Sequence, residues 1–213
     1  MAGLFRRRRL TAGRRPPLAP DERIIAWATA RPVAAPTVAE PADAADAAGT
    51  AGTADTPDAA GTADWAGGAE PVVVVTTLGL WLPGAAGRLG WHEIHKVTWS
   101  GRQLVVVAAR EVGADDGYTI VADEPATVHT LDQPDRVPPQ VRARVTKSIA
   151  YTRHAPLDGG GGVRVVARRV PGINGLRWTV RYDDGTDVAA DGVREVTAGL
   201  VAEGRAEIES AVP

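Results

Sequence analysis

The chain has 213 residues and a formal net charge of −2, and hydrophobic residues make up 44% of it, enough for one folded core. It contains no cysteine, which excludes disulfide bonds, thiolate zinc sites and a cysteine nucleophile. No stretch approaches the roughly 18 apolar residues of a membrane span, and no apolar run of a secretory signal follows the arginines at residues 6–9, so we expect a soluble cytoplasmic protein.

Charge is distributed unevenly along the chain. Residues 1–31 carry eight arginines and two acids, residues 32–70 carry seven acids and no base, and the remainder holds 16 bases and 17 acids. We expect residues 1–20 to be a disordered basic segment. Residues 32–70 are rich in Ala, Asp, Thr, Gly and Pro and cannot bury enough apolar surface to offset their ordering entropy. We therefore expect them to form a disordered acidic insertion.

Short strands separated by tight turns dominate the next part of the chain. Residues 23–28 alternate between two faces and predict a first strand. The β-branched run at residues 72–77 predicts a second strand, and Leu78-Gly79 indicates a turn before a return strand at residues 80–82. Further strands are predicted at residues 104–109, 118–122 and 126–131, with turns at residues 100–101, 116–117 and 123–125.

One stretch between these strands departs from strand alternation. Its apolar residues are Leu89, Trp91, Ile94, Val97 and Trp99, spaced by two, three, three and two. A bulge or a single helical turn at residues 92–96 would return all five side chains to one buried face.

An amphipathic helix is predicted to follow. It begins near Pro138, since proline is favoured in the first turn, with Asp135 upstream as a candidate cap. Its buried stripe recurs every four residues at Val137, Val141, Val145 and Ile149. Arg144, Lys147, Tyr151 and His154 fall on the opposite side. Asp158 and the glycines at residues 159–162 are expected to end the helix in a flexible hinge.

The C-terminal part predicts a β-hairpin and a second helix. Residues 163–170 and 176–182 form the strands, joined by the turn residues at 171–175. A helix over residues 188–211 would pack through residues such as Val193 and Leu200. Glycines inside it make it weak alone, so it must dock against the rest of the protein.

Seven strands followed by one helix is the order of a pleckstrin-homology-like (PH-like) domain. Residues 72–77, 80–82 and 89–94 resemble the bacterial PH-like pattern, in which a strand ending in Thr, a turn and an apolar strand precede an aromatic residue and an Ile that closes a bend. The chain is also similar to conserved actinobacterial proteins, with the resemblance covering residues 20–155 apart from the insertion. It implies no catalytic residues. Eukaryotic relatives bind phosphoinositides through a basic first loop, whereas this first loop is the acidic insertion.

These features predict an α+β fold with three parts. Residues 1–20 are a disordered basic N-terminus. Residues 21–157 form a mostly antiparallel PH-like barrel or sandwich capped by the amphipathic helix, interrupted by the disordered insertion at residues 32–70. Residues 158–213 extend this domain with the β-hairpin and the second helix.

Motifs of catalysis and cofactor binding are weak. His92 and His95 are three residues apart, one residue too close for the His-Glu-x-x-His zinc motif, and His129 is the only distant third ligand. None of the three serines lies in a Gly-x-Ser-x-Gly motif. The acidic pairs at residues 115–116, 123–124 and 183–184 fall in turns, where aspartate bonds locally. We therefore expect no enzyme, no cofactor and no metal.

Arginines of the C-terminal hairpin are the main functional clue. Even spacing places Arg164 and Arg168 on one face of their strand, and Arg177 and Arg181 on one face of the partner strand, opposite Trp178. The candidate anion-binding residues are Arg144, Lys147, Arg164, Arg168, Arg177 and Arg181. The alternative interpretation is that these residues form an ordinary solvent-exposed face, with their positive charge balanced by the glutamates of the last helix.

Three functional hypotheses follow. The first is a non-enzymatic interaction module, in which a groove between the sheet edge and the helix over residues 137–151 accepts a protein segment by strand addition. The second is binding of nucleic acid or anionic lipid through the hairpin and helix arginines. The third is an unrecognised hydrolase or metal enzyme.

Overall fold

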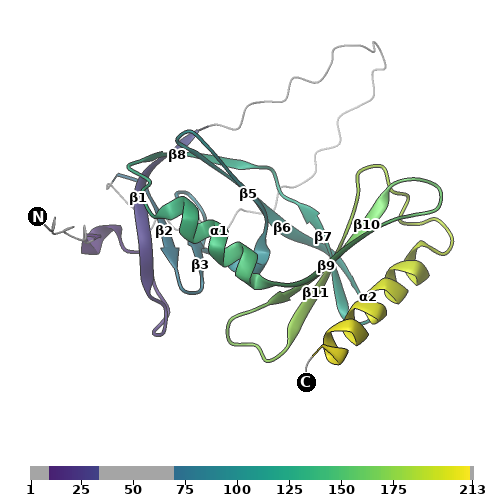
Figure 1. Ribbon diagram of the computed structural model, residues 1–213. Coiled ribbons are helices and arrows are strands. Elements are labelled where there is room, and N and C mark those ends of the chain that lie inside the picture. The colour runs from purple at the N-terminus through teal and green to yellow at the C-terminus, as the bar shows by residue number, and fades with distance from the viewer. Residues whose placement is uncertain (1–9, 34–69, 212–213) are drawn as a thin grey trace, which may run out of the picture.

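The computed structural model describes residues 10–33 and 70–211 (Figure 1). Most of the insertion predicted at residues 32–70 and the first nine residues of the basic N-terminus lie outside the described residues. Residues 10–20, which we expected to be disordered, are described, and Leu10 is buried against Val72 and Val74. These residues therefore cover part of a sheet.

Eleven strands and two α-helices make up the regular structure of the described residues. The strands before the first helix are β1 (Ile24–Val33), β2 (Val72–Thr76), β3 (Gly79–Trp81), β4 (Arg88–Gly90), β5 (Ile94–Ser100), β6 (Gln103–Asp115), β7 (Tyr118–Asp123) and β8 (Thr127–Asp132). The remaining elements are α1 (Val137–Ser148), β9 (Ile149–Pro156), β10 (Gly162–Arg169), β11 (Leu176–Tyr182), α2 (Val193–Ser210) and the 3-10 helices η1 (Ala12–Arg14) and η2 (Trp91–Glu93).

The strands form one path with two parts. We call the part in the order β4-β3-β2-β1-β8-β6, with β5 also paired to β6, sheet A. Sheet B has the order β6-β7-β11-β10-β9. All pairings are antiparallel except the short parallel pairing of β7 with β11. The α+β class and the mostly antiparallel sheet are therefore confirmed, but the path ends at β4 and β9, so the sheet is open.

Strand β6 joins the two parts. Its first half pairs with β5 on one side and with β8 on the other. Its second half, from Ala109 to Asp115, pairs with β7. Glu124 lies between β7 and β8 and donates its backbone N–H to the carbonyl of Ala108 at 2.8 Å. Strands β7 and β8 therefore run along the same side of β6.

Helix α1 packs on sheet A (Figure 1). Val137, Val141 and Val145 are buried in one core with residues of the sheet, so the predicted four-residue spacing is confirmed at three positions, whereas Ile149 lies in β9. Asp135 is not the cap: the N-cap is Arg136, and Asp135 has a left-handed φ of 34°. Pro138 lies in the first turn, as expected.

The end of α1 differs from the prediction. The helix stops at Ser148, and residues 149–156 form β9, which pairs antiparallel with β10. Pairing with β10 satisfies the backbone of a segment rich in β-branched and aromatic residues, which suits a strand. Tyr151 and His154 are therefore strand residues, and the glycines at residues 159–162 join two strands of a sheet instead of ending a helix.

The region around Trp91 contains both irregularities that the spacing suggested. Helix η2 makes one turn at Trp91–Glu93, and the register of β5 against β6 shifts between Ile94 and Lys96. Trp91 and Ile94 are buried as a result. Trp99 was expected on the same buried face but is 36% exposed.

The C-terminal hairpin forms as predicted, and α2 covers one face of sheet B. The helix begins at Val193, later than the expected residue 188. Trp178 of β11 packs on Tyr151 of β9 with ring centroids 5.6 Å apart. A Cβ atom at Gly204 of α2 would lie 2.7 Å from the Tyr151 ring and 3.0 Å from the Trp178 ring. Glycine at this position therefore lets α2 approach the sheet closely.

Candidate functional site

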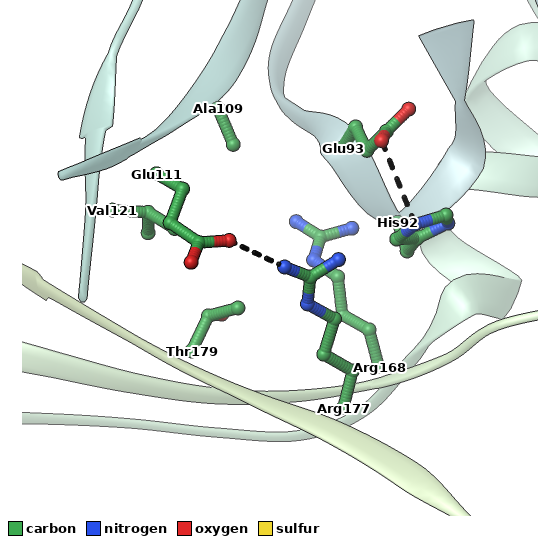
Figure 2. A pocket seen from close by; sticks show the side chains of 8 residues that line it. All are labelled: His92, Glu93, Ala109, Glu111, Val121, Arg168, Arg177 and Thr179. Atoms are coloured by element: carbon green, nitrogen blue, oxygen red, sulfur yellow. Dashed lines mark hydrogen bonds and ion pairs between the residues drawn. The ribbon is translucent and has the colours of Figure 1, made fainter. Parts of the chain in front are cut away.

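A cavity of about 230 Å³ lies on the face of sheet B opposite α2. Alternation along β10 and β11 explains its chemistry: Trp178, Val180, Val165 and Ala167 face α2, so their neighbours face the other way. Helix η2 borders this second face. The lining residues are His92, Glu93, Ala109, Glu111, Val121, Arg168, Arg177 and Thr179 (Figure 2).

Arg168 is the most unusual residue of the cavity. It is 5% exposed, and burial lowers the pKa of its guanidinium, which nevertheless stays protonated at neutral pH. One guanidinium nitrogen donates to the hydroxyl of Ser148 at 2.9 Å and to the carbonyl of Trp91 at 3.5 Å. It forms no ion pair with any acid among residues 10–33 and 70–211. The charge of Arg168 is therefore buried against neutral acceptors alone.

Arg177 lies opposite Arg168 on the neighbouring strand and is differently placed. It forms an ion pair with Glu111 at 2.9 Å. Figure 2 shows both guanidinium groups pointing into the space between Glu111 and η2. Glu93 at the other wall accepts a hydrogen bond from the backbone N–H of Gly90 at 2.6 Å, which fixes its position.

His92 contributes a neutral polar group. Burial lowers its pKa, and the arginines around it act in the same direction, while Glu93 raises it. The imidazole is therefore neutral at pH 7. Its Nδ1 atom is buried and has no hydrogen-bond partner within the described part of the chain. Its neighbour is Gly90, where an added Cβ atom would lie 2.9 Å from Nδ1.

A second polar group lies on the same face beside the cavity. Asp123 of β7 accepts from His95 at 2.6 Å and from Arg181 at 2.7 Å. Burial lowers the pKa of His95, and the hydrogen bond to Asp123 raises it in part. Asp123 thus holds β5 and β11 together across β6 and β7.

The predicted anion-binding residues are only partly brought together. Arg164, Arg168, Arg177 and Arg181 do share one face, because Arg164 lies opposite Arg181 and Arg168 opposite Arg177. Arg177 and Arg181 are ion-paired and Arg168 is buried.

The two cations predicted on the helix do not join this face. Arg144 of α1 donates to the carbonyl of Thr77, directly after the end of β2 in sheet A. Lys147 is exposed near the end of α1.

The residues considered as metal ligands or nucleophiles in the sequence occupy separate places in the structure. The described residues contain no group of three or more His, Asp or Glu side chains arranged to hold a metal. His95 is occupied by Asp123, and His129 is buried at 3% exposure. Ser148 donates its hydroxyl to the carbonyl of Val145 at 2.7 Å and accepts from Arg168, so it is a structural contact.

Sequence reasoning missed the acidic and neutral wall of the cavity. The sequence patterns predicted no role for Glu111 or Thr179. Thr179 is next to Trp178 in β11 and therefore lies on the same face as the arginines. His92 was considered only as a metal ligand. Two sequence features together could have predicted the site. Polar and apolar residues alternate along β11, and the strand-like spacing of apolar residues is interrupted at η2.

Comparison of the chain with protein-family models, with curated proteins and with solved structures finds no match. The resemblance to PH-like domains and to actinobacterial proteins therefore stays a sequence-based expectation. Neither α1 nor α2 is both long and apolar enough to cross a membrane, and this statement covers the described residues alone.

Proposed function

We propose that the protein is a non-enzymatic binding module whose cavity holds one anionic group of its ligand at Arg168. The observation that carries this proposal is the burial of Arg168 against neutral acceptors. A buried cation without an acidic partner is costly unless something compensates its charge. An anion in the cavity would supply that compensation through charge-assisted hydrogen bonds.

The charges of the cavity favour a carboxylate over a phosphate. Arg177 already pairs with Glu111, and Glu93 also lines the cavity, so the lining carries two acids beside its two arginines. A dianionic phosphate would be repelled by both glutamates at close range. A carboxylate carries one charge and matches Arg168, the one of the two cavity arginines that forms no ion pair with a described acid.

Nucleic-acid binding through the hairpin is the weaker candidate. Phosphate contacts require cations that are free to leave their present partners. Arg177 and Arg181 are already paired with acids, and Arg168 lies below the surface. Binding by this route would have to break two ion pairs.

Titration of the 15N-labelled protein with sodium butyrate and with inorganic phosphate tests the proposal. We expect butyrate to shift the NMR signals of Arg168 Nε, Ala109 and Thr179, and phosphate to shift them less. Arg168→Met removes the charge and should abolish the shifts of Ala109 and Thr179, whereas Arg164→Met, on the same strand and face but outside the cavity lining, should leave them. Equal shifts in both variants, or no shifts in the wild-type protein, would contradict the proposal.

A further inference from the structure

Strand β6 has an open edge next to the cavity. Pairing of β5 with β6 ends where Ile94 lies opposite Ala108. Beyond that point, from Ala109 to Asp115, β6 pairs with β7 on one side and with no other strand of the described chain. Edges of this kind are templates for an added strand.

The backbone of this edge is oriented for pairing. Ala108 accepts a hydrogen bond from Glu124, which lies on the β7 side. Because backbone groups of successive strand residues point to opposite sides, Ala109 and Glu111 present their N–H and C=O groups to the open edge. The register shift between Glu111 and Gly113 ends the regular edge, so it spans Ala109–Glu111.

The direction of an added strand determines which end meets the cavity. Strand β5 runs antiparallel to β6 and begins at Ile94, directly after η2. A second antiparallel strand on the open edge would lie in line with β5 and point toward its first residue. The last residue of that strand would therefore lie beside Ala109 and η2, which both border the cavity.

We propose that the site binds the C-terminal end of an extended protein segment, which adds an antiparallel strand to Ala109–Glu111 and places its terminal carboxylate at Arg168. This rests on the proposed function, and it identifies the anion as a chain terminus. Charge complementarity supports it, since a C-terminus carries one negative charge and Arg168 is the arginine of the cavity lining that forms no ion pair with a described acid. The edge supplies main-chain hydrogen bonds for affinity, and the cavity receives the terminal group.

The walls of the cavity also indicate the preferred last residue. Ala109, Val121 and the methyl group of Thr179 line the side away from η2, and a volume of about 230 Å³ accommodates a carboxylate with a small aliphatic side chain. We expect Val, Ile or Leu at the final position. An acidic side chain there would face Glu93 and Glu111 and should be rejected.

The other open edges lack this combination. The path of strands ends at β4 and β9, and β5 pairs with β6 alone. None of these three strands contributes a residue to the cavity lining, so none joins an open edge to the charge of Arg168.

A display library with six random residues and a free C-terminus tests this inference. We expect enrichment of sequences with an aliphatic last residue. The selected peptide, synthesised with a C-terminal amide, should bind about 10- to 100-fold more weakly, the loss expected for a hydrogen bond to a charged group. Arg168→Met should reduce binding of the free acid to the level of the amide, and Arg164→Met should not.

Hydrogen exchange distinguishes this inference from the proposed function. The peptide should slow exchange of the amides of Ala109 and Glu111, whereas butyrate should not. If butyrate binds but no peptide is enriched, or if acid and amide bind equally, the strand-addition inference is wrong and the carboxylate cavity stands. Tighter binding of decanoate than of any peptide would point to a fatty acid and overturn the inference. If butyrate fails to bind as well, the proposed function fails first.

Discussion

Sheet A is covered on both faces around β2, whereas sheet B is covered by a helix on one face. In sheet A the five residues of β2 are all buried, with Val73 and Val75 facing α1 and Val72 and Val74 facing Leu10. In sheet B the α2 face is apolar and the opposite face carries arginines, acids and the cavity. Apolar packing on both sides leaves no room for a ligand. A sheet with one polar face can exchange its internal ion pairs for contacts with a ligand.

The two sheets also place buried charge differently. In sheet A, Glu22 has a fully buried side chain that accepts hydrogen bonds from Thr76 at 2.6 Å, Trp81 at 3.0 Å and Arg88 at 2.8 Å. In sheet B, Arg168 has neutral acceptors and no acid within the described chain. The charge of Glu22 is fully compensated inside the protein, and that of Arg168 is not. We infer that the first stabilises the fold and the second is retained for binding.

Removing the Glu22 carboxylate should cause the largest loss of stability. Glu22→Ala leaves Arg88, Thr76 and Trp81 without their acceptor, and breaking a buried pair of this kind costs about 3–5 kcal/mol. Urea denaturation at pH 7 measures the loss. Glu70→Ala is the matched control, because Glu70 is 69% exposed in its pair with Arg14 and should contribute less than about 1 kcal/mol. Equal losses would remove the distinction between buried and exposed pairs.

Lowering the pH should reduce the stability that the Glu22 carboxylate contributes to the fold. Burial raises the pKa of Glu22, but its hydrogen bonds outweigh this and lower the pKa below its usual 4.5. The carboxylate therefore contributes stability above the unfolded pKa, and this contribution is lost as pH falls through the lower folded pKa. The difference in unfolding free energy between the wild-type protein and Glu22→Gln should shrink as pH falls below about 4.5. A difference that grows in acid would contradict the direction of the shift.

The docking of α2 on sheet B should respond to smaller changes. Gly204→Ala places a methyl group against Tyr151 and Trp178, and overpacking of this kind costs about 1–3 kcal/mol. Gly199→Ala, on the same helix with open space around it, should instead stabilise by about 1 kcal/mol through helix propensity. Hydrogen exchange of β10 and β11 amides should speed up in the first variant only. Stabilisation by both would show that α2 does not pack closely here.

Local patterns in the sequence predicted much of the architecture. The strand pairs of the C-terminal hairpin, the irregularity around Trp91 and the stripe of α1 all follow from spacing, because each depends on neighbours within a few residues. Strand β9 was missed because Ile149 continues the four-residue spacing of α1. Only the distant partner β10 decides that the chain extends there.

The candidate site was predictable only in part. Even spacing placed Arg168 and Arg177 on one face, and they do lie opposite each other. The sequence could not tell that Glu111, 66 residues from Arg177, would neutralise it while Arg168 kept neutral partners. That difference depends on the approach of β6 and η2 to the hairpin, which no local spacing encodes.

The smallest expected change in stability comes from replacing Arg168, and it tests the role of the polar face of sheet B most directly. If Arg168 is retained for a ligand, Arg168→Met should raise the unfolding free energy of the ligand-free protein by roughly 1 kcal/mol, because it replaces an uncompensated buried cation by an apolar side chain of similar length. Ser148 would keep its hydrogen bond to the carbonyl of Val145, so the substitution leaves no buried hydroxyl without a partner. Thermal denaturation measures the change. A clear loss of stability would mean that the bonds to Ser148 and Trp91 hold α1, η2 and β10 together, and that Arg168 serves the fold as Glu22 does.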